Sequence, residues 1–265
     1  METKTSTKLP FKEELIDLIK KELPLHSVYV ISVHKEKRKQ EIFLLPNCTS
    51  PQKTVTYTLL VIGQKSPLKG LGDFMDDLYN KMQRRCRVYV IFYTLSKVKK
   101  RLNYGDNFLS QVIFKTNCIY KKNSSLDQFS ECSLFINQRA YESIQEIWKV
   151  RMDRAEYLLS AIVDIQPKED SCSMLATMHL ALEQICMGLL YVFWEFKPQY
   201  YALPYLFQLC SNFTQLTQIM FPKETYGSHR MYYMLCNAQH IIRFKTKEEF
   251  SYRDSDKATK LKKQG

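Results

Sequence analysis

The hydrophobic period of this chain changes part-way along its length, and that change limits the folds available to it. Before residue 122, runs rich in β-branched and aromatic residues recur at 28–33, 55–62 and 87–93, and segments with helical spacing precede the first run and separate the second from the third. From residue 138 onward, apolar residues follow the 3.6-residue helical period. The sequence therefore predicts an α+β protein of two domains.

The first region is predicted to be a small α/β domain. Helices are expected at 11–23, 68–82, 95–102 and 108–114, with a short edge strand at 118–120. Strands that alternate with helices are typical of a sheet covered by helices. Residues 121–128 are polar and rich in turn formers, which marks the end of the domain. We place the α/β domain at 1–122 and a linker at 123–137.

The second region is predicted to be an up-and-down bundle of four helices, at 138–252. The helices are expected at 141–162, 174–196, 200–213 and 228–244. The second of them is apolar on almost every side, so other helices must cover it. Residues 253–265 contain several lysines and are expected to form a basic disordered tail.

Composition restricts the classes of partner. The net charge of +12 favours phosphate-bearing partners, because a basic surface attracts nucleotides and nucleic acids. The eight cysteines form no Cys-x-x-Cys pair, so we expect free thiols in a reducing cytoplasm and no structural zinc. The longest apolar runs, such as 185–194, are too short to cross a bilayer. We expect a cytoplasmic protein with no membrane partner.

Residues 11–122 resemble minimal nucleotidyltransferases in their layout. The stretch Val28-Tyr-Val-Ile-Ser-Val-His-Lys35 occupies the place of the family's first strand, Gly-Ser pair and basic turn. The stretch Val55-Thr-Tyr-Thr-Leu-Leu-Val-Ile62 occupies the place of its Asp-x-Asp strand, and 88–96 that of a third strand. In that family the two aspartates hold Mg²⁺ against a triphosphate.

The signature residues of that family are replaced in this chain. Thr56 and Thr58 stand at the metal-ligand positions, where they share one face of a strand, but neutral hydroxyls cannot replace two charged ligands of Mg²⁺. Ser32 and Val33 stand at the Gly-Ser positions, and Val33 has a branched side chain where the backbone would approach phosphate. We predict a catalytically degenerate domain, a pseudoenzyme without metal or cofactor. The alternative is an unrelated α/β domain with ordinary strand threonines.

The helical region resembles the HEPN family of four-helix domains, which often accompany such nucleotidyltransferases. The likeness lies in residues 149–159, 179–190 and 238–245. It implies a homodimer formed through the helical domain. HEPN ribonucleases carry an arginine and, after four to six further residues, a histidine, and none of the five histidines here follows an arginine at that interval. Ribonuclease activity is therefore disfavoured.

Five residues of the helical region are candidates for binding nucleotide or RNA. His179 and Glu183 lie four residues apart on one helix, where they would face either a pocket or each other in an internal hydrogen bond. His240, Arg243 and Lys245 form a basic strip that would bind phosphate or simply complement the end of a helix.

Together these features predict a non-catalytic, dimeric protein that binds a nucleotide or RNA, and we do not expect DNA. One alternative is an enzyme: a HEPN-type ribonuclease with an atypical site, or a nucleotidyltransferase that uses Asp73, Asp76 or Asp77, although these acids fall on a predicted helix. Another is a regulator of the toxin–antitoxin type that acts by protein contact.

Overall fold

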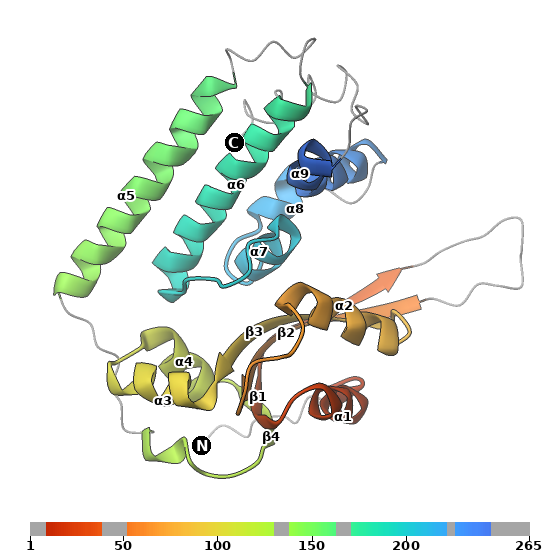
Figure 1. The fold of residues 1–265 in the computed structure, drawn as a ribbon, viewed down its shortest axis with the longest axis vertical. Helices are drawn as coiled ribbons and strands as arrows, with labels where there is room; N and C mark the ends of the chain where they lie inside the picture. Colours follow the sequence, from red (N-terminus) through yellow and green to blue (C-terminus); the bar gives the residue numbers. More distant parts are fainter. Residues whose placement is uncertain (1–8, 39–51, 130–137, 163–170, 222–225, 245–265) are drawn as a thin grey trace, which may run out of the picture. The chain divides into compact units, whose positions relative to one another are not determined.

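The computed structural model describes residues 9–38, 52–129, 138–162, 171–221 and 226–244. The chain divides into two compact units, residues 1–135 and 136–265. The first unit contains a sheet with helices, and the described part of the second is helical (Figure 1). The protein is thus of the α+β class.

The sheet of the first unit has the strand order β3-β2-β1-β4 (Figure 1). The strands are β1 (Leu25–Arg38), β2 (Gln52–Gly63), β3 (Cys86–Thr94) and β4 (Asn117–Lys121). β1 runs antiparallel to both β2 and β4, whereas β2 and β3 are parallel. A parallel pair needs a crossover connection, and α2 (Leu71–Lys81) supplies it. The three main strands and the edge strand lie where the sequence predicts them.

The remaining elements of the first unit are α1 (Lys12–Glu22), α3 (Leu95–Asn103), α4 (Asn107–Lys115) and the 3-10 helix η1 (Asp127–Phe129). The helices confirm the predicted ones to within a few residues. Leu126 and Phe129 are buried, so part of the segment expected to be a linker packs onto this unit.

Strand β2 is central, and its apolar side chains form much of the core. Val55, Tyr57, Leu59 and Val61 occupy one face and are all buried. The hydroxyl of Tyr57 donates a 2.7 Å hydrogen bond to the carbonyl of Pro10, just before α1. Burial raises the pKa of Tyr57 above its ordinary value, because the phenolate would lose its hydration.

The second unit is arranged around one central helix. Its helices are α5 (Gln138–Ala161), α6 (Ser171–Trp194), α7 (Leu203–Cys210), α8 (Leu216–Met220) and α9 (Tyr226–Phe244). α6 packs against α5, α7 and α9, which gives its apolar sides the cover that the sequence requires.

Helix α7 is shorter than the 200–213 segment predicted for it. Pro204 lies in its first turn, where a backbone N–H would have no partner within the helix. Beyond the end of the helix, the side chain of Asn212 donates hydrogen bonds to the carbonyls of Gln208 and Leu209, which belong to its last turn. The chain then forms α8, which the sequence analysis did not predict.

Gly188 permits a close approach of α5 to α6. A Cβ at this position would lie 2.9 Å from the Cε of Met152 and 3.2 Å from the Cε3 of Trp148. A larger residue would clash with these two side chains of α5. This explains why glycine, which usually destabilises a helix, occurs inside α6.

Among the described residues, α6 is the one helix long and apolar enough to cross a membrane by length and composition. However, 56% of its apolar window is buried inside the protein. The helix is thus equally typical of the core of a soluble protein, and the structure is compatible with one.

Candidate functional site

Thr56 and Thr58 lie on the face of β2 opposite the apolar row of Tyr57. The register places Thr58 between Ser32 of β1 and Tyr89 of β3. Thr56 lies between His34 of β1 and Arg87 of β3. Residues that pair across strands project to the same face, so these side chains are neighbours. We call Ser32, His34, Thr56, Thr58 and Arg87 the polar strip.

Two hydroxyls of the polar strip are buried without a hydrogen-bond partner. Thr58 is fully buried, and its Oγ1, like the Oγ of Ser32, has no partner within the described part of the chain. Leaving a buried polar group unpaired costs about 1–3 kcal/mol. Hydroxyls rarely stay unpaired in protein interiors, so a pair of them on adjacent strands marks this face as a candidate binding site.

Ser32 and Val33 lie inside strand β1 and not at its end. The sequence likeness places a basic turn directly after them, but β1 continues to Arg38 and pairs with β2 as far as Gln52. The expectation of a turn at this point is therefore wrong. The alternation of side chains continues past Val33, and the long partner strand supplies backbone hydrogen bonds throughout.

The polar strip carries cations and hydroxyls. His34 is exposed, and the guanidinium of Arg87 lies 4.9 Å from the ring centroid of Tyr79 on α2. Burial lowers the pKa of Arg87, but the hydroxyls of Tyr89 and Tyr79 more than offset this effect, so the net shift is upward. The next pair along the strands is Glu36 and Thr54; the side chain of Glu36 lies outside the described part.

The structure provides no ready-made metal site among its described residues, where no three His, Cys, Asp or Glu side chains are placed to hold an ion. The acids of the enzyme alternative are on α2. Asp77 forms an ion pair with Lys69, and the hydrogen bond from this lysine lowers the pKa of the carboxyl. Asp73 and Asp76 are exposed on the same helix, and α2 is separate from the strand that carries Thr56 and Thr58.

In the helical unit, His179 is buried and held by the backbone of α9. Its Nδ1 lies 2.7 Å from the carbonyl oxygen of Leu235. A carbonyl oxygen can only accept, so the Nδ1–H group of His179 donates this hydrogen bond. The internal partner of His179 is therefore a backbone group, not Glu183. Next to Glu183, Gln184 accepts a 2.6 Å hydrogen bond from Nη1 of Arg151 on α5.

Glu183 is half-buried, and this burial disfavours the ionised form of its carboxyl. Burial raises its pKa above the ordinary value, while the nearby charges of His179 and Arg151 lower it by a smaller amount. This carboxyl thus lies inside the helical unit beside two basic side chains.

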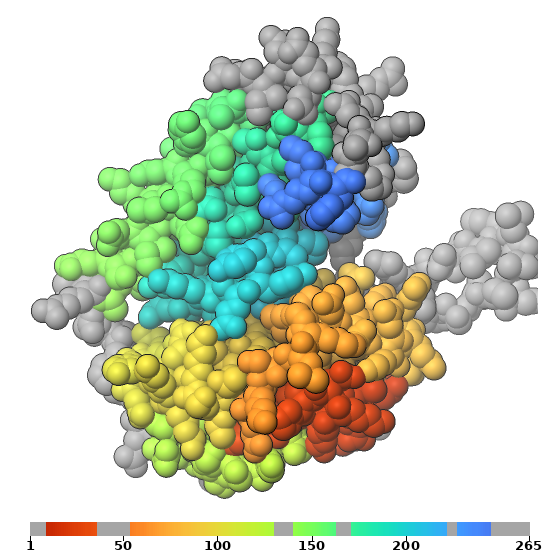
Figure 2. Space-filling model, in the orientation of Figure 1, coloured from red at the N-terminus to blue at the C-terminus, as the bar shows by residue number. Residues whose placement is uncertain are grey.

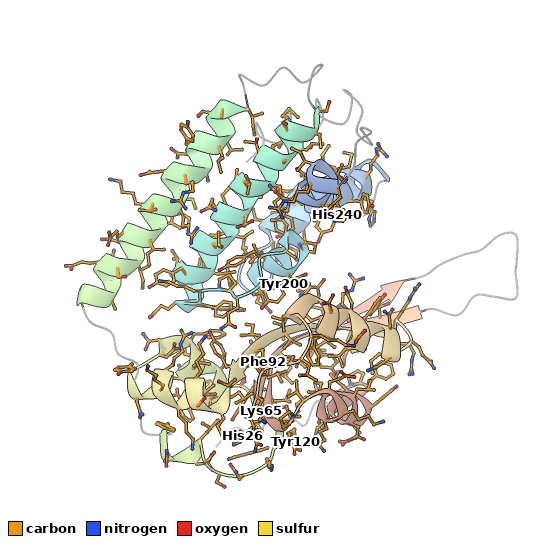
Figure 3. The ribbon with its side chains drawn as sticks, viewed as in Figure 1. His26, Lys65, Phe92, Tyr120, Tyr200 and His240 are labelled. Atoms are coloured by element: carbon orange, nitrogen blue, oxygen red, sulfur yellow. The ribbon has the colours of Figure 1, made fainter. Side chains whose placement is uncertain are left out.

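The other candidates of the helical unit lie at the end of α9. His240, labelled in Figure 3, is exposed, as is Arg243. The centroid of the His240 ring lies 4.9 Å from that of Phe244. Lys245 lies outside the described residues. The structure does not bring His240 and His179 into one group, since one is on the surface and the other in the core.

Sequence reasoning did not anticipate the network around His26. This imidazole is fully buried, and its Nε2 lies 2.9 Å from Oδ1 of Asn123 and 3.0 Å from Oγ of Ser125. Figure 3 shows His26 near Tyr120, the β4 residue that pairs with Val28. Because all its partners are internal, this histidine fastens residues 123–125 to β1.

Three cysteines that are distant in sequence lie together in the helical unit. The thiol of Cys210 lies 3.7 Å from the carbonyl of Cys186, and Cys236 is near enough to affect Cys186 electrostatically. The hydrogen bond with Cys210, followed by burial, raises the pKa of Cys186 well above its ordinary value. Such thiols are poor nucleophiles, so they act as small apolar side chains of the core.

No family model and no curated protein matches this chain. Among solved structures, it is similar to a nucleotidyltransferase-like protein from Exiguobacterium sibiricum 255-15, with 13% identity and a TM-score of 0.24 over 90% of this chain and 73% of that chain. A superposition this loose identifies no family.

Proposed function

We propose that this chain is a non-catalytic nucleotide- or RNA-binding protein of the nucleotidyltransferase–HEPN type, and that its polar strip holds a phosphate-bearing ligand without Mg²⁺. One observation carries the proposal: His34 and Arg87 are exposed on either side of the half-buried Thr56, and the unpartnered hydroxyls of Ser32 and Thr58 lie buried beside them on the same face. A ligand that displaces the side chains covering these two hydroxyls would give both of them a partner. A hydroxyl donates readily to a phosphate oxygen, the charge of Arg87 attracts it, and a ring N–H of His34 can donate to it.

The same residues argue against metal-assisted transfer at this face. Mg²⁺ requires anionic oxygen ligands and is usually held by one or two carboxylates together with substrate phosphates. The positions two residues apart on β2 carry Thr56 and Thr58, and Arg87 beside them would repel a cation. Phosphate binding through hydroxyls and cations needs no metal.

The first test is isothermal titration of the full chain with ATP, GTP and a short oligoribonucleotide, each with and without Mg²⁺. We expect at least one ligand to bind with an affinity that does not depend on Mg²⁺. Binding that requires Mg²⁺ and is accompanied by turnover would instead support the enzyme alternative. No binding by any of the three would favour a regulator that acts by protein contact.

A pair of matched variants assigns the binding to the polar strip. Thr58→Val removes an unpartnered hydroxyl and keeps the branched shape, so we expect weaker binding by about tenfold, the effect of one hydrogen bond to a charged group. Thr177→Val is the control, because its hydroxyl is already used in a 2.8 Å hydrogen bond to the carbonyl of Ser173 on α6. Equal losses in both variants would contradict a site on the sheet.

Dimerisation through the helical unit is the second part of the proposal. Its support is the exposed apolar side chains on several helices of this unit, including Tyr157 on α5 and Tyr233 on α9. Sedimentation velocity of the full chain over a range of concentrations should give a species of twice the 31.4 kDa mass. A monomer at every concentration would remove this part and leave the ligand proposal intact.

A further inference from the structure

The outer face of α3 is basic and ends in an exposed aromatic ring. Ser96, Lys97, Lys100, Asn103 and Tyr104 are all exposed, and their spacing places them on one side of the helix. Val98 and Leu102 on the opposite side are buried. We call these five exposed residues the α3 face, and Figure 2 shows the atoms of this segment (yellow) at the surface of the first unit.

The charges of α3 are not balanced within the helix. It contains Lys97, Lys99, Lys100 and Arg101 and no acidic residue. Arg101 is used internally, since it pairs with Asp106 and donates a 2.8 Å hydrogen bond to the hydroxyl of Tyr93. The described residues provide no ion pair for Lys97 or Lys100.

Helix α1 of the same unit shows what a merely solvated charged face looks like. Its lysines alternate with acids, and ion pairs join Lys12 to Glu13 and Lys20 to Asp17. Other acids of α1 bind cations from outside the helix, as Glu14 does with Arg85. The field of α1 is therefore largely neutralised locally, whereas that of the α3 face extends into solvent.

The backbone conformation at the end of α3 leaves the side chain of Tyr104 exposed to solvent. Gly105 follows with a φ of 75°, a left-handed conformation that ends the helix, and its N–H bonds to the carbonyl of Leu102. Tyr104 is left 81% exposed, one of the most exposed large side chains in the described protein. An aromatic ring in this position exposes apolar surface to water, which is unfavourable unless another planar group stacks on the ring.

We infer that the α3 face binds single-stranded nucleic acid, with Lys97 and Lys100 on the phosphates and a base stacked on Tyr104. Exposed cations that follow a backbone, combined with an exposed ring for an unpaired base, are the two elements that single-strand binding requires. This surface is separate from the polar strip. The two sites are therefore told apart by their variants: substitutions on the α3 face should not change nucleotide binding at the polar strip, and Thr58→Val should not change binding of a single strand to the α3 face.

The test measures anisotropy of a fluorescein-labelled single-stranded oligouridylate bound to the full chain across a salt series. Lys97→Gln/Lys100→Gln should flatten the slope of log K against log salt by about 1.4, because each phosphate contact on a single strand contributes roughly 0.7. Tyr104→Ala should weaken binding by ~5-fold to ~150-fold at every salt concentration and leave the slope unchanged. Tyr104→Trp should retain binding, because it keeps a ring available for stacking.

The control is Lys20→Gln/Lys21→Gln, which removes the same charge from α1. The basic C-terminal residues are present in every variant, so differences between variants report on the replaced side chains. The inference is overturned if the α1 control reduces binding as much as the α3 variant, or if Tyr104→Ala has no effect. Failure of the oligouridylate to bind at low salt, while phosphatidylserine vesicles bind through the same lysines, would also overturn it and identify a membrane surface instead.

Discussion

The buried polar side chains of α6 and those of the polar strip differ in whether they have partners. On α6, His179 bonds to the backbone of α9 and Gln184 bonds to Arg151 of α5, so these two buried groups have defined internal partners. In the polar strip, Ser32 and Thr58 are paired residues of adjacent strands, and the hydroxyls of both are buried without a partner. Partnered groups join helices together, whereas unpartnered groups retain hydrogen-bonding capacity for something outside the chain.

This difference gives the two regions opposite expected responses to mutation. Removing a partnered buried group should lower stability, because it breaks a contact and leaves its partner unpaired. Removing an unpartnered one should cost little stability and should instead affect binding. Four substitutions test this comparison.

The largest effect is expected for His179→Ala. It removes the hydrogen bond to Leu235 and leaves a cavity between α6 and α9, so the free energy of unfolding should fall by about 2–4 kcal/mol. Urea denaturation followed by circular dichroism measures it. A loss below about 0.5 kcal/mol would mean that this contact does not hold the helices together.

Arg151→Met should cost less. The apolar stem of the side chain is retained, but Gln184 loses its hydrogen-bond donor, so we expect a loss of about 1–2 kcal/mol. The double variant with Gln184→Met is the sharper measurement. If the two groups act as a pair, the double variant is less destabilised than the sum of the single ones.

Glu183→Gln should give a smaller effect that depends on pH. Burial raises the pKa of Glu183 in the folded state above its unfolded value near 4.5. The contribution of this carboxyl to the free energy of unfolding is therefore fully present below pH 4.5 and is lost as the pH rises through the pKa of the folded state. The glutamine variant does not ionise. It should therefore be more stable than the wild type at pH 7, and the difference should disappear at acid pH in paired denaturation curves.

Thr58→Val should have the smallest effect on stability, within about 0.5 kcal/mol of zero or slightly stabilising, because the lost hydroxyl has no partner. Thermal unfolding measures this, and the titration proposed above measures the loss of ligand binding. A destabilisation of ~2 kcal/mol would show that the hydroxyl has a structural role, which would remove the contrast between the two regions.

The sequence predicts the local elements of this fold well, because their patterns are strong. The β-branched run at Val55 and the helical spacing before Pro24 each specify one kind of structure, and the period of two correctly places Thr56 and Thr58 on one face. Helix α8 escaped prediction because Leu216–Met220 is too short to show a period.

The neighbours of the two threonines could not be predicted in the same way. That His34 lies opposite Thr56, and Arg87 on its other side, depends on strand register. β1 and β2 are joined by a long segment, and β1 contains a register shift between Val30 and Ser32, so the pairing cannot be counted from the sequence. The same holds for Cys186, Cys210 and Cys236, which meet only through helix packing.

The close contact at Gly188 also gives the protein a built-in optical probe. The chain has two tryptophans, Trp148 and Trp194, and both belong to the helical unit. The indole of Trp148 packs against α6 at Gly188, which has no side chain. The fluorescence emission of Trp148 should therefore change as soon as α5 separates from α6. Fluorescence excited through tryptophan alone will thus follow the helical unit, and comparison with the circular dichroism of the whole chain will reveal whether the sheet unfolds with it.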